Sequence, residues 1–248
     1  DSTRAAQAMR EAGVGCIVTL GGDGTNRVVA RGCGDVPLVP ISTGTNNVFP
    51  VMIEGTIAGL AAGVVAAGIA PAEQVARRAL RLEVCRDNQV VDIALVDVAV
   101  YDDLFVASRA IWDMSKVRAV VLTRAEPGNI GLSSIGGSLR AMPANGRHGL
   151  FLRIGAGGPQ VLAAVAPGIV RRVSIAEHRL LSPGDTVRVT DRPSVLALDG
   201  EREIPVLPDD EYEIRLSANG PRVVDVPAAL AAAAAAGFFL GGGPARID

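Results

Sequence analysis

A glycine turn directly after an apolar, β-branched run constrains this chain more than any other feature. The run Cys16–Leu20 stops at Gly21-Gly22-Asp23-Gly24, and Thr25-Asn26 opens a helical pattern. In an α/β domain, a parallel strand delivers its loop to the active edge of the sheet at such a junction. Glycines let backbone N–H groups approach a ligand closely, and a helix N-terminus attracts phosphate.

Asp23 argues against simple anion binding in this turn. A carboxylate repels a phosphate unless a cation lies between them or the acid handles a proton, so the turn indicates nucleotide chemistry with a metal. A dinucleotide fingerprint starting at Gly22 would need glycine where Arg27 stands, and no lysine follows as a Walker A loop requires. The alternative is a tight strand–helix turn with an incidental acid.

A second polar loop follows the next apolar strand, which we expect at Pro37–Ile41. The loop Ser42–Pro50 offers uncharged donors and acceptors that suit ribose hydroxyls, base edges and phosphate oxygens. Adjacent parallel strands would bring this loop and the glycine turn to the same edge of the sheet. Taken alone, the loop could equally serve to cap the segment from Val48 onward.

Three weaker features lie further along the chain. Asp199-Gly200-Glu201 favours a hairpin turn, whose tip could aim a carboxylate across a cleft. Ile130–Ser138 is a loop of small residues that lacks the spacing of a nucleophile elbow. Arg109, Trp112 and Asp113 form an unusual cluster, for which an edge packing motif with a surface ion pair is the simpler interpretation.

The sequence resembles a known superfamily at these motifs. Gly21-Gly22-Asp23-Gly24-Thr25 is similar to the GGDGT signature shared by NAD kinases, diacylglycerol kinases and sphingosine kinases. With Ile41–Pro50 and Glu54-Gly55-Thr56, the chain resembles the ATP-NAD-kinase-like branch that includes the acetoin catabolism X proteins. Asp199-Gly200-Glu201 resembles a motif of bacterial diacylglycerol kinases, where the glutamate lies near the transferred phosphate.

The resemblance implies an ATP-dependent small-molecule kinase that uses Mg²⁺. Asp23 and Glu201 would be catalytic, accepting the proton of the attacking hydroxyl or helping to hold the metal, and Asp199 and Glu201 would be metal ligands. Asn46-Asn47 lacks the acid found in the Asn-Glu pair of NAD kinases and the Asn-Asp pair of lipid kinases, which puts its role in question. The expected nucleotide-binding residues are Gly21, Gly22, Gly24, Thr25, Asn26, Thr43, Gly44, Thr45, Asn46 and Asn47.

The implied fold is α/β plus all-β: a Rossmann-like parallel-sheet domain followed by a β-sandwich, with a C-terminal helix that returns to the first domain. We expect the first domain at 1–78 and 227–248 and the second at 79–226, where short strands alternate with Gly/Pro turns. Among the expected elements are a helix over Glu54–Ala67, packed closely through Gly59, Ala62, Gly63 and Ala66, and one extended run over Val90–Val100. Because the chain opens directly in a helix at Asp1, we expect that preceding segments are missing and could complete the nucleotide site.

Composition narrows the function. The 248 residues are 49% hydrophobic, which suffices for a buried core, and a net charge of −2 with 3% aromatic residues argues against nucleic-acid binding. Three cysteines without a CxxC pair fit a reducing cytoplasm. The apolar run Ala228–Leu240 is shorter than the ~20 residues that span a bilayer, so we expect a cytoplasmic protein without stable membrane association.

The distribution of basic residues best predicts which kind of molecule accepts the phosphoryl group. The paired basic residues Arg77-Arg78 and Arg171-Arg172 are too short and separated to hold an anionic membrane surface. A soluble molecule with a hydroxyl group therefore fits better as the phosphoryl acceptor than a lipid, and the ribose of NAD is the first candidate. We also expect a homo-oligomer. A lipid kinase and a non-catalytic nucleotide-sensing protein remain alternatives, and a dinucleotide-dependent oxidoreductase is the least favoured.

Overall fold

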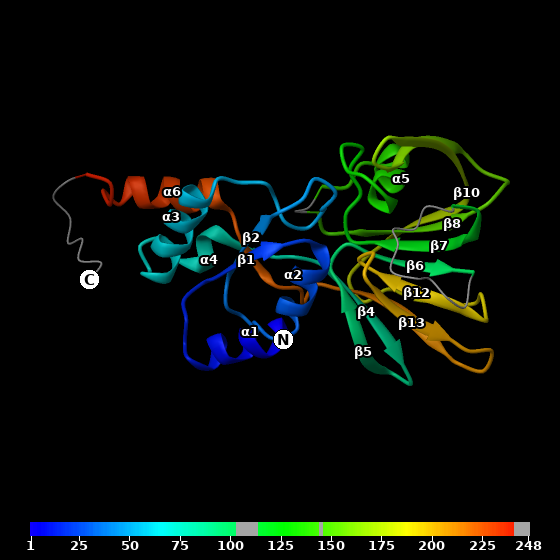
Figure 1. The fold of residues 1–248 in the computed structure, drawn as a ribbon, viewed down its shortest axis with the longest axis horizontal. Coiled ribbons are helices and arrows are strands. Elements are labelled where there is room, and N and C mark those ends of the chain that lie inside the picture. The colour runs from blue at the N-terminus through cyan, green and yellow to red at the C-terminus, as the bar shows by residue number, and fades with distance from the viewer. Residues whose placement is uncertain (103–113, 144–145, 241–248) are drawn as a thin grey trace.

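The computed structural model describes residues 1–102, 114–143 and 146–240, and these residues form an α/β part and a larger β part joined end to end (Figure 1). The predicted cluster Arg109, Trp112 and Asp113 lies outside the described residues. The α/β part holds a four-stranded sheet in the order β1-β2-β15-β3, in which β1, β2 and β15 run parallel and β3 is antiparallel to β15. Its elements are α1 (Ser2–Glu11), β1 (Ile17–Gly21), α2 (Asp23–Ala30), β2 (Leu38–Ser42), α3 (Gly55–Ala66), α4 (Ala72–Val75), β3 (Ala76–Arg78), β15 (Arg222–Val224) and α6 (Val226–Ala235).

Helices cover both faces of this sheet. Leu38 of β2 is buried with residues of α1 and α2, whereas its neighbour Val39 is buried with α3 and α6. Successive side chains of a strand point to opposite faces, so the two pairs of helices lie on opposite sides. The predicted return of the C-terminal helix to the first part is therefore confirmed.

The small residues of α3 do not act as the sequence predicts. Ala62 is buried, but Gly59, Gly63 and Ala66 are exposed, and a Cβ added to either glycine would meet nothing within 4 Å. The buried positions are Ala58, Ala61, Ala62, Val64 and Val65. The helix is apolar on most sides, so the pattern of small residues did not distinguish the face that packs from the face that is open.

The β part consists of two sheets packed face to face. One has seven strands in the order β13-β12-β6-β7-β8-β10-β9, and the other has four in the order β11-β14-β4-β5. The strands are β4 (Arg81–Arg86), β5 (Gln89–Ala94), β6 (Asp97–Tyr101), β7 (Val117–Leu122), β8 (Gly149–Ile154), β9 (Gln160–Ala166), β10 (Ile169–Leu181), β11 (Thr186–Arg188), β12 (Ser194–Leu198), β13 (Arg202–Val206) and β14 (Tyr212–Ser217), with a 3-10 turn at Met114–Lys116 and helix α5 at Leu132–Leu139.

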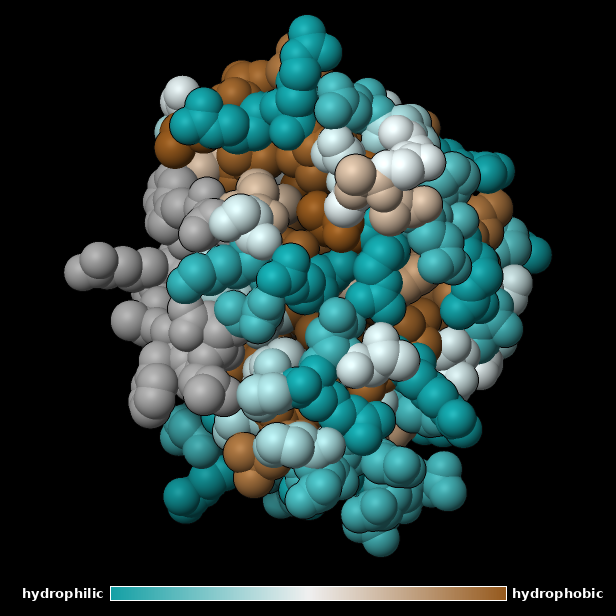
Figure 2. Space-filling model, turned by 90° about the vertical axis from the view of Figure 1, so that its right-hand side faces the viewer, coloured by the Kyte–Doolittle hydropathy of each residue, from teal (hydrophilic) through white to brown (hydrophobic). Residues whose placement is uncertain are grey.

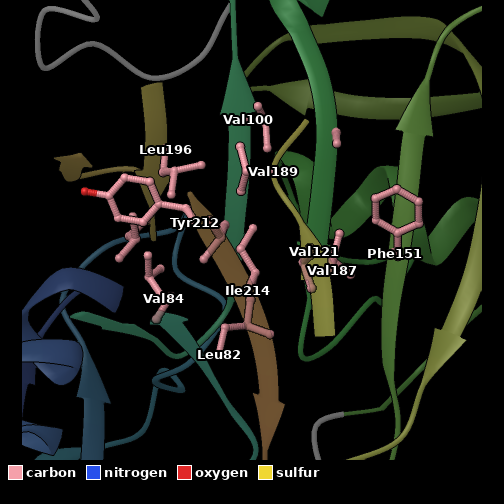
Figure 3. Close-up of a cluster of buried hydrophobic side chains, with 14 of the residues drawn as sticks. Leu82, Val84, Val100, Val121, Phe151, Val187, Val189, Leu196, Tyr212 and Ile214 are labelled. Carbon is pink, nitrogen blue, oxygen red and sulfur yellow. The ribbon is translucent and has the colours of Figure 1, made fainter. Parts of the chain in front are cut away.

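The core between the sheets is built from alternate residues of facing strands. Leu82 and Ile214 come from the smaller sheet, and Val121, Phe151 and Leu196 from the larger, in one buried cluster (Figure 3). The side of the β part seen in Figure 2 presents mainly hydrophilic side chains, with apolar residues between them. None of the described helices is long and apolar enough to cross a membrane.

The expected run Val90–Val100 is two strands. β5 ends at Ala94 and β6 begins at Asp97, because the backbone N–H groups of Leu95, Val96 and Asp97 donate to the Asp199 carboxylate instead of extending a ladder. The apolar run continues through this break at Ile93–Val96, so the sequence pattern does not reveal it.

The expected small-residue loop at 130–138 is mostly helix. Leu132–Leu139 forms α5, packed against β7 and β9. A Cβ on Gly136 would lie 2.5 Å from Leu122, and one on Gly137 would lie 2.2 Å from the backbone of Glu126. The glycines that suggest a loop are therefore needed for close helix–sheet packing.

Candidate functional site

Asp23 joins the glycine turn to the second polar loop. It is the first residue of α2, and its carboxylate accepts hydrogen bonds from the backbone N–H of Val48 at 3.0 Å and of Phe49 at 2.7 Å. The parallel pairing of β1 with β2 places both loops at the same sheet edge. Burial raises the pKa of Asp23, against the hydrogen bonds and the Arg124 charge that lower it.

Asn47 strengthens the same junction. A Cβ on Gly22 would lie 2.8 Å from Asn47 Oδ1, so the asparagine side chain packs on the glycine. Its Nδ2 donates to Ser42 Oγ at 2.7 Å. The absence of a side chain at Gly22 therefore lets the two loops meet.

Asn26 and Thr25 also brace the turn. Asn26 is fully buried, accepts from Thr19 Oγ1 at 2.6 Å and donates to the Gly22 carbonyl at 2.8 Å. The Thr25 side chain packs on Gly21, where a Cβ would lie 2.6 Å from its Oγ1. Thr43, Gly44, Thr45 and Asn46 are exposed, so among the predicted nucleotide-binding residues these four are open to a ligand.

Asp199 reaches the site from the tip of the β12–β13 hairpin. Its backbone has φ 49°, as suits a tight turn, and Gly200 follows with φ 69°. The carboxylate accepts from the N–H of Leu95 at 2.9 Å, Val96 at 2.8 Å and Asp97 at 3.2 Å. Burial nevertheless raises the pKa of Asp199 to about 7.

Asp97 is a site residue that the sequence analysis missed. Together with Asp23 and Asp199 it lines a cavity of about 170 Å³, along with Asn46, Val48, Gly131 and Leu132. Burial, and then the Asp199 and Asp23 carboxylates, raise the pKa of Asp97 well above its ordinary value. The signal available in the sequence was an acid in an apolar run that also contains Asp92, and such an acid is equally typical of a strand at the edge of a sheet.

Glu201 lies beside the glycine turn, although 177 residues separate it from Gly24. Its carboxylate occupies the space where a Cβ of Gly24 would sit, with Oε2 only 1.8 Å from that position. Its charge contributes to the raised pKa of Asp23. The structure thus brings the first and third motifs together, and Glu201 is exposed there.

No set of three or more His, Cys, Asp or Glu side chains in the described ranges is arranged to hold a metal ion. Asp199 uses both carboxylate oxygens to accept backbone N–H groups, whereas Glu201 is exposed at the turn. Mg²⁺ in kinases is commonly bound by one or two carboxylates together with substrate phosphates. Of the two predicted metal ligands, Glu201 therefore fits a magnesium–phosphate group better than Asp199.

The N-terminus of α5 opens on the same cavity. Gly131 precedes this helix with φ 82°, no side chain among the described residues caps it, and Gly131 and Leu132 line the cavity. Uncapped N–H groups at a helix start favour a ligand with negative charge. The cavity therefore combines carboxyl groups that accept hydrogen bonds with a helix end that favours phosphate.

Arg124 supports the second loop from behind. It is buried, donates from Nη1 to the Val48 carbonyl at 3.3 Å, and its guanidinium carbon lies 4.8 Å from the centre of the Phe49 ring. Burial lowers the pKa of Arg124, although Asp23 opposes this shift. The arginine therefore holds the two residues whose N–H groups bind Asp23.

Arg27 ties the α/β part to the β part. Its Nη1 lies 3.2 Å from Asp92 of β5, and its Nε lies 3.9 Å from Asp199. Arg31 and Arg202 pair with the same Asp92 carboxylate, at 3.2 and 3.1 Å. The residue that breaks the dinucleotide fingerprint thus belongs to an ion-pair cluster under the site.

Comparisons with known proteins agree with this architecture. Similar solved structures include yeast NADH kinase in complex with NADH, with TM-score 0.51 and 14% identity, covering 94% of this chain and 68% of that one. A putative diacylglycerol kinase from Bacillus anthracis has TM-score 0.53 and 13% identity, covering 92% and 84%. The fold is therefore that of the NAD kinase and diacylglycerol kinase class.

The sequence matches are more specific. A model of the ATP-NAD kinase N-terminal domain matches residues 1–69, and a model of the acetoin catabolism protein X C-terminal domain matches residues 80–219. The chain belongs to the acetoin catabolism protein X family. It is 42% identical over 237 residues to acetoin catabolism protein X of Cupriavidus necator, covering 93% of this chain and 66% of that protein.

Proposed function

We propose that this chain transfers a phosphoryl group from ATP to a hydroxyl of a nucleotide acceptor, with the ribose of NAD as the first candidate. The observation that carries the proposal is the convergence of Asp23, Asp97 and Asp199 on one cavity beside the glycine turn. Carboxyl groups suit ribose hydroxyls, which donate hydrogen bonds to them. The helix start at Gly131 suits the phosphates of the same ligand.

Asp97 and Asp23 divide the work at the acceptor. None of the described residues donates a hydrogen bond to the Asp97 carboxyl, and its raised pKa makes the ionised carboxylate a stronger proton acceptor than an ordinary aspartate. Asp23 uses its oxygens to hold the second loop, so it would position the acceptor as well as share the proton with Asp97. We assign the proton-accepting role to this pair.

Glu201 would hold Mg²⁺ together with the phosphate oxygens. The ion supplies charge neutralisation at the transferred phosphate. Glu201 lies against Gly24, so its charge is directed at the turn whose backbone would cradle the phosphates. The exposed hydroxyl and amide groups of Thr43, Thr45 and Asn46 would grip the nucleotide from the second loop.

A non-catalytic nucleotide-binding regulator is the second candidate. It is favoured by the three backbone hydrogen bonds to Asp23, which use this acid to join two loops, and by the missing acid at Asn46-Asn47. Such a protein would bind the same ligands without transfer.

The test offers the full chain ATP and magnesium with NAD, and separately with a diacylglycerol dispersion. Phosphorylated NAD is the expected product. Product from the lipid and none from NAD would show that the acceptor is a lipid hydroxyl and not the ribose of NAD. Saturable nucleotide binding without product from either acceptor would establish the regulator instead.

A further inference from the structure

A second cavity, of about 1370 Å³, lies behind the second polar loop between the two parts of the chain. Val48 lines the candidate site, whereas the next residue, Phe49, lines this cavity, and the two cavities share no lining residue. Nothing in the proposed phosphoryl transfer uses this space. Its volume exceeds the roughly 300–1,000 Å³ of a typical small-ligand site.

The walls of this cavity are apolar. Val39 of β2, Leu80 and Val223 line it together with Phe49, and Val51 and Met52 stand at its rim with 58% and 71% of their surface exposed. Exposed apolar side chains gathered at a hollow are typical of a site that takes an apolar ligand.

Basic side chains surround the same cavity. Arg77, Arg78, Arg124, Arg147 and His148 line it, against a single acid, Asp225, which caps α6 by accepting from Ala228 N–H. Arg78 pairs with Asp35 at 2.6 Å. Within the described ranges, Arg77 and Arg147 form no ion pair, so they are available to an anion.

Arg124 provides an independent sign of a missing partner. It is 7% exposed, and its Nε is buried without a hydrogen-bond partner among the described residues. Leaving a buried charged donor unsatisfied costs more than leaving a neutral one, so such a group indicates that a ligand or water completes it. Arg124 lines the cavity, where an anion could reach this group.

We propose that this cavity binds an amphipathic anion, an apolar chain with a phosphate or carboxylate head. The apolar chain of the ligand would lie on Val39, Phe49, Met52 and Val223, and its anionic head would contact the arginines. An apolar wall alone would accept a neutral chain, and arginines alone would accept inorganic phosphate; their combination selects a ligand that has both parts.

The site touches the residues that hold Asp23. Arg124 donates to the Val48 carbonyl and stacks on Phe49. The backbone N–H groups of these two residues bind the Asp23 carboxylate. An anion bound to Arg124 would therefore be connected to the glycine turn through Arg124 and the loop residues that it contacts. Binding itself does not depend on the proposed kinase activity and is tested without it.

The test is isothermal titration of the full chain with decyl phosphate and decanoate, each below its micelle-forming concentration, and with inorganic phosphate and a neutral decyl glucoside. Saturable binding of one decyl anion per chain is expected, at least tenfold tighter than that of phosphate or glucoside. The tighter of the two decyl anions identifies the head. Equal affinity for phosphate or for the glucoside would overturn the proposal.

Two variants and two matched controls locate the binding. R77A/R147A and M52E, all at exposed positions, should each weaken decyl anion binding at least tenfold. As controls, R171A/R172A removes the same charge from β10, and L162E adds the same charge at an exposed position of β9. Neither control should change the affinity for the decyl anion. Unchanged binding in both cavity variants would overturn the site. A wild type that binds no decyl anion and becomes monomeric on M52E would show a subunit interface instead.

Discussion

The backbone N–H of Phe49 donates a 2.7 Å hydrogen bond to the Asp23 carboxylate, across 26 residues of sequence. Val48 N–H shares the same carboxylate, so the first residue of α2 fixes the loop that follows β2. The acid of the glycine turn therefore has a structural task, whatever its part in chemistry. Its two tasks can be separated by two substitutions.

We expect Asp23→Ala to lower the free energy of unfolding by about 1–3 kcal/mol, because two partly buried N–H groups lose their acceptor. Asp23→Asn keeps an oxygen for both donors and should cost less, while turnover falls by ~10²–10⁴ as for a catalytic acid or base. Urea denaturation and initial rates measure the two effects. Wild-type turnover in Asp23→Asn would leave Asp23 with the structural task alone.

Asp92 should contribute strongly to the free energy of unfolding, because its ion pairs join the α/β part to the β part. Asp92→Ala removes the closer of the two carboxylates that pair with buried Arg27 and leaves Asp199 at 3.9 Å, and breaking a buried pair costs about 3–5 kcal/mol. Glu213→Ala is the control, because Glu213 pairs at the surface with Arg188, which is 82% exposed, and such pairs contribute about 0–1 kcal/mol. Urea unfolding should separate the two variants, and similar losses would mean that the Asp92 cluster is no stronger than a surface pair.

Asp199 should make stability depend on pH. Burial raises its pKa to about 7, above the value near 4 in the unfolded chain, so the folded chain binds more protons between these values. The free energy of unfolding should therefore fall as the pH rises from about 4 through 7. The raised pKa of Asp97 acts in the same direction.

Asp199→Asn should flatten this dependence, because asparagine does not titrate and tolerates φ 49°. Urea unfolding of the wild type and the variant across this range measures the slope. Asp209→Asn, which removes an exposed acid by the same substitution, is the matched control. An equal slope in Asp199→Asn would show that Asp199 is ionised throughout.

Gly24 should act through Glu201. A Cβ at Gly24 would displace the Glu201 carboxylate, which is the end of a flexible side chain, so Gly24→Ala should cost little stability. If Glu201 holds the magnesium–phosphate group, Gly24→Ala and Glu201→Ala should each reduce turnover, and the double variant should lose little more than either. A double-mutant cycle measures this coupling. Additive losses would mean that the two residues act independently.

The sequence predicts the α/β part well because its signals are local. Asp1 caps α1 by accepting from Arg4 N–H, and Gly13 follows the end of this helix with φ 74°, both as their residue types indicate. The parallel pairing of β1 and β2 is also confirmed. The start of α2 lies two residues earlier than expected, because Gly22 takes the capping position and Asp23 the first turn.

The remaining features depend on contacts between distant residues. Asp199 breaks the run Val90–Val100 from more than 100 residues away, and Arg27 finds Asp92 across 65 residues. Periodicity contains no trace of either contact. Asp97 was missed for the same reason, since only the hairpin tip and the glycine turn make that acid part of a site.

Phosphorylation of NAD by Asp97→Asn tests the central claim most directly, because this carboxyl lines the cavity without a described hydrogen-bond donor. With ATP and magnesium, the initial rate should fall by ~10²–10⁴ relative to the wild type, while Asp209→Asn keeps the wild-type rate. The unfolding midpoint of Asp97→Asn should show that the fold is retained. A wild-type rate in folded Asp97→Asn would contradict phosphoryl transfer at this cavity.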